Sequence, residues 1–168
     1  DSKYLFQVNF RADAYDSSKL SKKNRWGYFP SVSLGWVLSK ENFMQNIKSV
    51  TFLKLRGSYG VNGNINSLSS FAYTTSMQLS GSAYSLTNSG LLSAAAPSTM
   101  LANEDLTWEE TSQINIGLDS RFFNDRLSFN VDYFDKTTVG MLSSISAPSV
   151  SGASSQNVNA GKIQNTGF

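Results

Sequence analysis

The sequence predicts an all-β protein: an antiparallel meander that forms part of a large transmembrane β-barrel, with residues 1–168 in one barrel domain. Three observations support this fold class. Five segments alternate apolar and polar residues over about ten positions, the pattern of a strand with two different faces. The connections between these segments are very unequal in length. Charged residues make up 15% of the chain, against roughly 25% in soluble globular domains.

The first three alternating segments are residues 4–13, 31–39 and 52–61, and only Leu5 breaks the pattern clearly. The apolar face of these segments carries Tyr4, Phe6, Val8, Phe10, Val32, Leu34, Trp36, Leu53 and Leu55. The polar face carries Gln7, Asn9, Arg11, Lys54 and Arg56. Each segment is therefore expected to form a strand that is half in contact with apolar surroundings.

Residues 112–121 and 126–133 repeat the alternation. Their apolar face carries Ile114, Ile116, Leu118, Leu127, Phe129 and Val131. Their polar face carries Gln113, Asn115, Asp119, Arg121, Asn130 and Asp132. In a barrel these two sets of side chains would face lipid and lumen respectively.

A soluble β-sandwich would alternate too, and strand length separates the two interpretations. Ordinary strands average about 5 to 6 residues. About ten residues, at about 3.3 Å each and a tilt near 45°, cross the roughly 25 Å apolar band of an outer-membrane barrel. The length therefore favours strands that span a membrane, with the apolar set facing lipid and the polar set facing the lumen.

The connections indicate an orientation. The turn "FFNDR" at 122–126 is tight, whereas about 45 residues rich in Ser, Gly, Asn and Ala separate Val61 from Thr107. Transmembrane barrels have short periplasmic turns and long extracellular loops. We therefore expect residues 13–25 and a long loop at about 63–106 to be extracellular, and residues 38–52 to be periplasmic.

Aromatic residues are crowded at one end of the second strand, in "RWGYFPSVSLGW" at 25–36. Trp26, Tyr28 and Phe29 fall where this strand leaves the outer loop, the level at which aromatic rings gather in membrane proteins. Pro30 lies beside them, where a missing ladder hydrogen bond costs less than at mid-strand. The three aromatic residues are predicted to form an outer aromatic girdle.

The composition excludes several functions. The chain has no cysteine and no histidine, so disulfides, zinc sites of Cys and His and Ser-His-Asp catalysis are ruled out. Basic residues are scattered apart from a few near Lys22, which argues against binding of nucleic acid. We expect no enzymatic activity and no cofactor, although an outer loop could hold calcium near the acidic residues Glu104, Asp105, Glu109 and Glu110.

The long loop contains the aromatic residues Phe71, Tyr73 and Tyr84. They could stack on sugar rings, or they could only pack the loop.

Four blocks carry a family resemblance: "NRWGYFPSVSLGW", "LKLRGSYGVNGN", "LTWEETSQINIGLDSRFFNDRLSFNVDYFDKTTVGML" and "NAGKIQNTGF". They resemble, in order, the SusC/RagA-type TonB-linked transporters in the outer membrane of Bacteroidota, which are Gram-negative bacteria. The stretch from about 66 to 105 matches no block, as expected of a variable outer loop. The resemblance covers most of the chain.

The resemblance implies a 22-stranded barrel closed by an N-terminal plug, energised by TonB and capped by a SusD-like surface lipoprotein. The implied function is active import of a nutrient, an oligosaccharide or an oligopeptide, across a bilayer containing lipopolysaccharide. These 168 residues contain no plug and no TonB box, so those parts are expected in a longer protein. Three alternatives stay open: a passive porin, a structural subunit of a larger outer-membrane assembly, and a soluble β-sandwich binding module.

Overall fold

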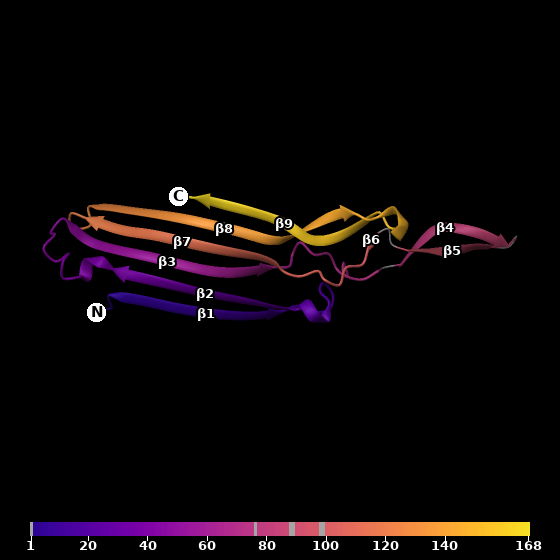
Figure 1. Cartoon of the computed structure of the whole chain (residues 1–168), viewed down its shortest axis with the longest axis horizontal. Helices are drawn as coiled ribbons and strands as arrows, with labels where there is room; N and C mark the ends of the chain where they lie inside the picture. Colours follow the sequence, from indigo (N-terminus) through magenta and orange to yellow (C-terminus); the bar gives the residue numbers. More distant parts are fainter. Residues whose placement is uncertain (1, 76, 88–89, 98–99) are drawn as a thin grey trace.

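The computed structural model describes residues 2–75, 77–87, 90–97 and 100–168, and its main feature is one seven-stranded sheet (Figure 1). Six strands follow one another as an antiparallel meander: β1 (Tyr4–Ala14), β2 (Trp26–Val37), β3 (Val50–Asn64), β7 (Glu109–Phe122), β8 (Leu127–Ser146) and β9 (Ser155–Gly167). The two-residue strand β6 (Met100–Leu101) adds to β9 in parallel. Each segment that the alternation predicted corresponds to an observed strand, although β2 ends at Val37 and not at residue 39, and β8 begins at Leu127 and not at residue 126. The all-β antiparallel fold class is confirmed.

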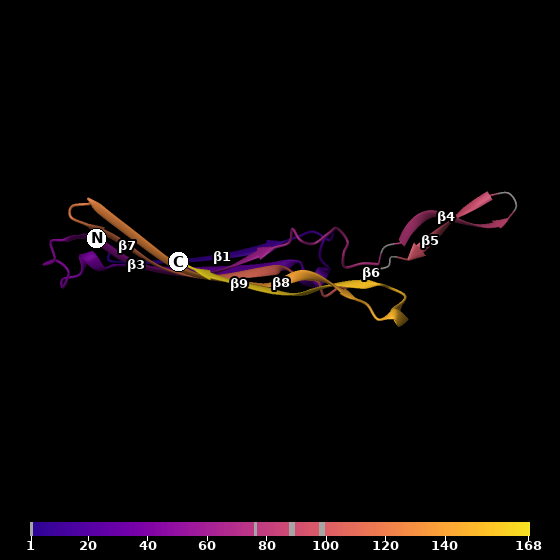
Figure 2. The same cartoon turned by 90° about the horizontal axis from the view of Figure 1, so that it is seen from above.

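The sheet is a single layer, as the edge-on view in Figure 2 shows. In the described part of the chain the only helical segments are three short 3₁₀ turns, Lys22–Asn24, Leu38–Lys40 and Ser149–Ser151. No helix among the described residues has the length and apolarity needed to cross a membrane. Large apolar side chains on the sheet therefore remain uncovered. Phe6, for example, is 71% exposed.

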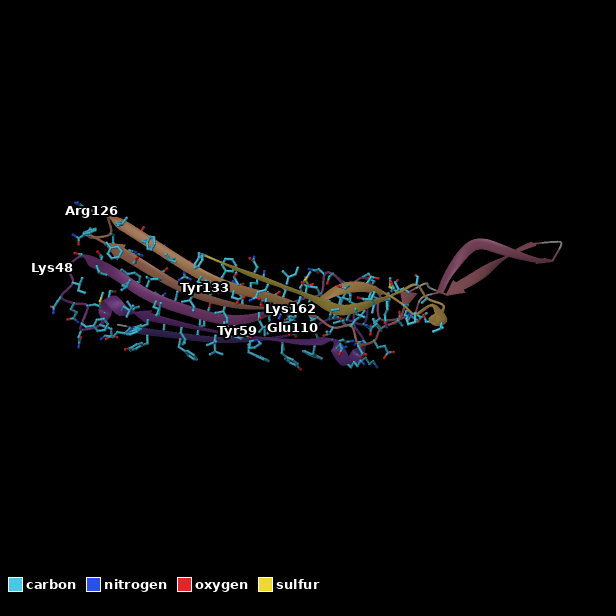
Figure 3. All side chains as sticks on the ribbon, turned by 45° about the horizontal axis from the view of Figure 1, so that its top comes forward. Lys48, Tyr59, Glu110, Arg126, Tyr133 and Lys162 are labelled. Atoms are coloured by element: carbon cyan, nitrogen blue, oxygen red, sulfur yellow. The ribbon has the colours of Figure 1, made fainter. Side chains whose placement is uncertain are left out.

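The connections divide between two ends of the sheet, which we call the turn end and the loop end. The turn end carries residues 38–49 and 123–126, and the labelled residues Lys48 and Arg126 lie there together (Figure 3). The loop end carries residues 15–25, 65–108 and 147–154. The grouping of 15–25 with 65–108, and of 38–49 with 123–126, is the one that the sequence predicted, whereas the connection at 147–154 was not predicted.

The long segment at 65–108 is only partly irregular, although we had expected a loop at about 63–106. It contains the hairpin of β4 (Met77–Thr87) and β5 (Gly90–Pro97), as well as β6. The hairpin projects beyond the loop end of the sheet (Figure 1). Its residues lack the strict alternation of the five predicted segments, which is why periodicity did not reveal it.

A small apolar core lies at the loop end, built mainly from the connections there. It consists of Leu20, Phe29, Ile65, Leu68, Leu106 and Trp108, each less than a tenth exposed. The loops at this end are therefore packed against one another and against β2. We call residues 15–25, 65–75 and 102–108 the outer rim.

Candidate membrane face, lumen face and outer rim

Strand pairing decides which side chains share a face, because residues directly opposite each other in an antiparallel pair point to the same side. One row runs from Tyr4 on β1 through Trp36, Leu55 and Leu118 to Val131 on β8. Followed through every pair, the register puts all fifteen residues of the predicted lipid-facing set on one face, which we call the apolar face. The eleven residues of the predicted lumen-facing set lie on the other, the polar face.

The band of large apolar side chains slants across the apolar face. On β1 it runs from Tyr4 to Phe10, and on β8 from Leu127 to Tyr133. Because the row of Tyr4 reaches β8 at Val131, the band on β8 starts four residues nearer the turn end. Four steps from strand to strand separate β1 from β8, so the shift averages about one residue per strand, although on β2 the band still ends at Trp36, in the row of Tyr4.

Aromatic residues mark both ends of this band on β1 and β2. Near the loop end, Trp26 and Tyr28 are exposed on the apolar face, and Tyr28 stacks on Phe10 with ring centroids 6.1 Å apart. Near the turn end, Tyr4 stacks on Trp36 with centroids 6.3 Å apart. Only the group near the loop end was predicted from the sequence. The group near the turn end could have been predicted too, because Tyr4 is the first apolar residue of the segment 4–13 and Trp36 lies near the end of the segment 31–39.

A single carboxylate connects the rings near the turn end to the 38–49 connection. Glu41 accepts hydrogen bonds from Trp36 Nε1 at 3.1 Å and Tyr4 Oη at 2.9 Å, and it pairs with Lys3 Nζ at 3.4 Å. These donors favour the charged carboxylate, so the pKa of Glu41 lies below its usual value, with the Trp36 hydrogen bond as the main cause. The connection is thereby held against β1 and β2.

Phe29 does not belong to the outer aromatic girdle, and its predicted place there is wrong. It pairs with Arg11, which puts it on the polar face, and only 4% of it is exposed. Its ring packs edge-on against Trp108 with centroids 5.6 Å apart, and a Cβ on Gly63 would clash with it. The reason is tertiary: β2 pairs with β3 only as far as Ser31, and Phe29 packs where the two strands separate.

The polar face has a charged cluster toward the turn end. Arg56 Nη2 lies 2.6 Å from Asp132 Oδ1, and Arg56 Nε lies 3.3 Å from Asp119 Oδ2. Arg56 and Asp132 are on strands that are not neighbours, and Gly117 of β7 lies between them in register. A Cβ at Gly117 would come within 2.6 Å of Arg56 Cζ. The missing side chain at Gly117 is what lets Arg56 reach across β7.

Hydrogen bonds hold the outer rim together around its apolar core. The segment before β7 is bonded to the 15–25 connection: Ser21 Oγ donates to Glu104 O at 2.9 Å, and Trp108 Nε1 donates to Arg25 O at 3.2 Å. On its other side, the Asn159 amide accepts from Thr107 N at 3.0 Å and donates to Thr107 O at 3.1 Å. Asn159 thus pairs with Thr107 much as a strand residue would.

The acidic residues of this rim do not form a single site. Asp105 pairs with Lys23, which raises the pKa of that lysine, and Glu109 and Glu110 occupy successive positions of β7. Successive residues of a strand point to opposite faces. Among the described residues, no group of three or more carboxylates is arranged to hold a metal ion.

The aromatic residues of the long segment separate into different roles. Phe71 is 57% exposed and has φ of 58°. Tyr73 is half-buried against the rim core and donates to Ser17 O at 2.7 Å, so it packs the rim. The side chain of Tyr84 lies outside the described residues.

Comparisons with known sequences agree with this geometry. The family described as TonB dependent receptor-like, beta-barrel, matches residues 1–168. A TonB-dependent receptor of Formosa agariphila is 38% identical over 169 residues, which cover 99% of this chain and 15% of that protein. The TonB-dependent receptor SusC of Bacteroides thetaiotaomicron is 34% identical over 168 residues, which cover 99% of this chain and 16% of that protein.

Solved structures give the same answer. The RagAB peptide importer in its open-open state matches with a TM-score of 0.83 and 30% identity, over 99% of this chain and 17% of that one. In the closed-closed state the TM-score is 0.77. This chain therefore spans about one sixth of the length of the proteins it matches. The family is one of outer-membrane transporters and not of enzymes, and its similar members come from Bacteroidota. The chain belongs to the TonB dependent receptor-like β-barrel family and is part of a SusC/RagA-type outer-membrane barrel.

Proposed function

We propose that this chain forms part of the barrel wall of an active importer, which carries an oligosaccharide or oligopeptide across the outer membrane. The observation that supports this best is the single-layer sheet with one apolar and one polar face. In a soluble sandwich the apolar face would be covered by a second sheet. Among the described residues nothing covers it, and side chains such as Leu34 are 58% exposed.

The slant of the apolar band supports lipid as the covering medium. A shift of one residue per strand is about 3.3 Å along the strand for about 4.8 Å between strands, an angle of about 35°. Strands of outer-membrane barrels tilt by about 35–45° to the membrane normal. If strands are tilted in a bilayer, an apolar band that lies parallel to the membrane plane must cross them at an angle equal to that tilt. A soluble sheet has no such requirement.

The two aromatic groups give the band its height. Trp26 and Trp36 are ten residues apart on β2, about 33 Å along the strand. At a tilt of about 40° this corresponds to a depth of about 25 Å, the height of the apolar band in such barrels. In this placement Tyr4 and Trp36 lie at the periplasmic boundary, Trp26 and Tyr28 at the outer one, and the outer rim is extracellular.

The partners of the proposed importer follow from its relatives. RagAB is a peptide importer, and SusC is a TonB-dependent receptor. By analogy, a SusD-like surface lipoprotein would cover the outer rim, and TonB would act on a plug elsewhere in the full-length protein. The lumen would be lined by the polar face and the membrane side by lipid and lipopolysaccharide.

Deletion of the gene in its own bacterium tests the proposal. We expect loss of TonB-dependent growth on one class of oligosaccharide or oligopeptide, restored by the full-length protein and not by one without its plug. Uptake that continues after the proton motive force is collapsed would indicate a passive porin. Purification with many envelope proteins, and no change in growth on any nutrient, would indicate a structural subunit.

A further inference from the structure

The turn end exposes large apolar side chains on both of its connections. On the longer connection Phe43 is 63% exposed and Ile47 is 44% exposed, and on the shorter one Phe123 is 57% exposed. The two connections contact each other, because Phe123 N donates to Ser49 O at 3.0 Å. Apolar side chains gathered at one end of a molecule mark a surface that another molecule or medium covers.

Both connections meet the apolar face of the sheet. Glu41 accepts hydrogen bonds from the side chains of Tyr4 and Trp36, which are on that face. The ring of Phe123 lies 6.5 Å from the ring of Phe122, the last residue of β7 on the same face. The exposed side chains of the turn end therefore continue the apolar band, at its periplasmic boundary in the proposed placement.

Backbone hydrogen bonds give the longer connection a defined path. Four successive turns close within it, each through a donor three residues after its acceptor, and the donors are the N–H groups of Glu41, Met44, Ile47 and Val50. Together with the side-chain bonds of Glu41, these turns hold the segment that presents Phe43.

The same connections carry an excess of positive charge. Their two carboxylates are Glu41, which is already paired, and Asp125. Lys40, Lys48 and Arg126 are exposed and have no ion-pair partner among the described residues. Lys48 and Arg126 lie at the tip of the turn end (Figure 3). Exposed rings and unpaired cations thus occur on the same two short segments.

We propose that the turn end binds anionic phospholipid, with its exposed rings in the headgroup layer and its cations against the lipid phosphates. Segments that combine exposed apolar side chains with Lys and Arg bind anionic bilayer surfaces. The alternative occupant is a periplasmic protein. Continuity with the apolar band favours lipid, because a bilayer that covers the band brings its headgroups to this height. The inference rests on the membrane placement proposed above and adds a lipid class to it.

The test uses the full-length protein in non-ionic detergent micelles, with a reporter at the turn end. Gln45 is exposed and the chain has no cysteine, so Gln45→Cys can carry a fluorescent label once any cysteines elsewhere in the full-length protein are replaced. The probes are brominated phosphatidylglycerol, which is anionic, and brominated phosphatidylcholine, which has no net charge; bromine quenches the label when lipid binds beside it. The variant combines Lys48→Gln with Arg126→Gln. The matched control is Lys22→Gln, which removes an exposed cation of the loop end.

We expect half-maximal quenching at an at least five-fold lower concentration of phosphatidylglycerol than of phosphatidylcholine. A cation near an anionic bilayer surface strengthens binding about five-fold. The double variant should therefore need at least five-fold more phosphatidylglycerol, whereas Lys22→Gln should stay within two-fold of the wild type. Should the double variant fail to show the heat-dependent gel mobility of a folded barrel, each single variant should still weaken binding at least two-fold.

The rings are tested by a matched pair of phenylalanines. Phe123 and Phe71 are both 57% exposed, and both have positive φ, 53° and 58°, but Phe71 lies at the loop end. Asn tolerates this backbone conformation, so Phe123→Asn and Phe71→Asn remove the rings with little strain. Phe123→Asn should weaken binding of both lipids at least two-fold, and Phe71→Asn should leave it unchanged.

Several results would overturn the inference: equal quenching by the two lipids, unchanged quenching in the turn-end variants, or an equal loss in the loop-end controls. Displacement of phosphatidylglycerol by inorganic phosphate at matched ionic strength would also overturn it, since the site would then take free phosphate. A photo-cross-linking amino acid in place of Phe43 should capture phospholipid in cells, and capture of a protein instead would favour the alternative occupant. Uptake does not enter these measurements. A protein that binds lipid as expected but supports no TonB-dependent uptake therefore refutes only the proposed function.

Discussion

The charged cluster on the polar face leads to a prediction about Gly117. Arg56 and Asp132 are 39% and 48% exposed, and their closest atoms are 2.6 Å apart across Gly117. Two unit charges 4 Å apart attract by about 4 kcal/mol at an effective dielectric constant near 20, and fully exposed pairs contribute about 0.2–1 kcal/mol. For this half-exposed pair we expect a coupling energy of about 1 kcal/mol.

Gly117→Ala should abolish that coupling, because the new Cβ would occupy the space that the Arg56 guanidinium and the Asp132 carboxylate now share. Arg56 contacts Asp119 through Nε, which the new Cβ would approach to 2.9 Å, so we expect this second contact to weaken less than the contact with Asp132. The measurement is a double-mutant cycle with Arg56→Met and Asp132→Asn, by urea unfolding of the full-length protein in micelles, with and without Gly117→Ala. The control cycle pairs Arg56 with Asp119.

Two results would refute this reasoning. One is a coupling between Arg56 and Asp132 that is indistinguishable from zero in the wild-type background. The other is a coupling of the same size after Gly117→Ala, which would mean that the pair does not need the gap in β7. A loss of both couplings in that background would show that the alanine disturbs the whole cluster.

Further predictions concern the apolar face, the outer rim and the turn end. Val131→Arg should destabilise the barrel by about 2–4 kcal/mol if the side chain faces lipid near mid-membrane. Asn130→Arg, on the opposite face, should destabilise it far less. Equal losses of stability in urea unfolding would contradict the assignment of the two faces. Phe29→Ala should cost about 3–5 kcal/mol because it empties a buried site, whereas Tyr28→Ala, whose side chain is exposed, should leave the rim core intact; protease cleavage of the rim measures both. The pKa of Glu41 is lowered in the folded state, so its stabilisation is complete above the usual value near 4.5 and is lost as pH falls through the lower folded value. Glu41→Gln should therefore flatten the stability profile below about pH 4.5, and an unchanged acid limb in a pH series would contradict this.

The alternation of the sequence was enough to assign the two faces of the sheet, because successive side chains of a strand point to opposite faces. Once Tyr4 and Trp36 are opposite each other, every second residue of β1 and β2 follows. Strand ends were less predictable: β8 continues to Ser146, well past the last clear alternation. In that region its partner is β9, and a bulge at Gly140, where φ is 72°, shifts the register.

The features that the sequence analysis missed depend on contacts between distant segments. Phe29 looked like a girdle residue because it follows Trp26 and Tyr28, but its surroundings come from Leu20, Leu106 and Trp108, far along the chain. Glu41 lies in a connection whose path no periodicity describes. Its contact with Tyr4 joins residues 37 positions apart.

The link between β3 and β7 explains why specific contacts matter in this sheet. A short hairpin turn fixes the register of its two strands, but residues 65–108 separate β3 from β7 and can fix nothing so local. In the proposed placement, a slip of β3 by one residue would turn Leu55 toward the lumen and Arg56 toward lipid. Such a slip would bring an arginine into contact with lipid, which destabilises the barrel, and would break its contacts with Asp119 and Asp132. The two faces therefore specify the same register together, and the long segment between the strands is free to build the rim at the loop end.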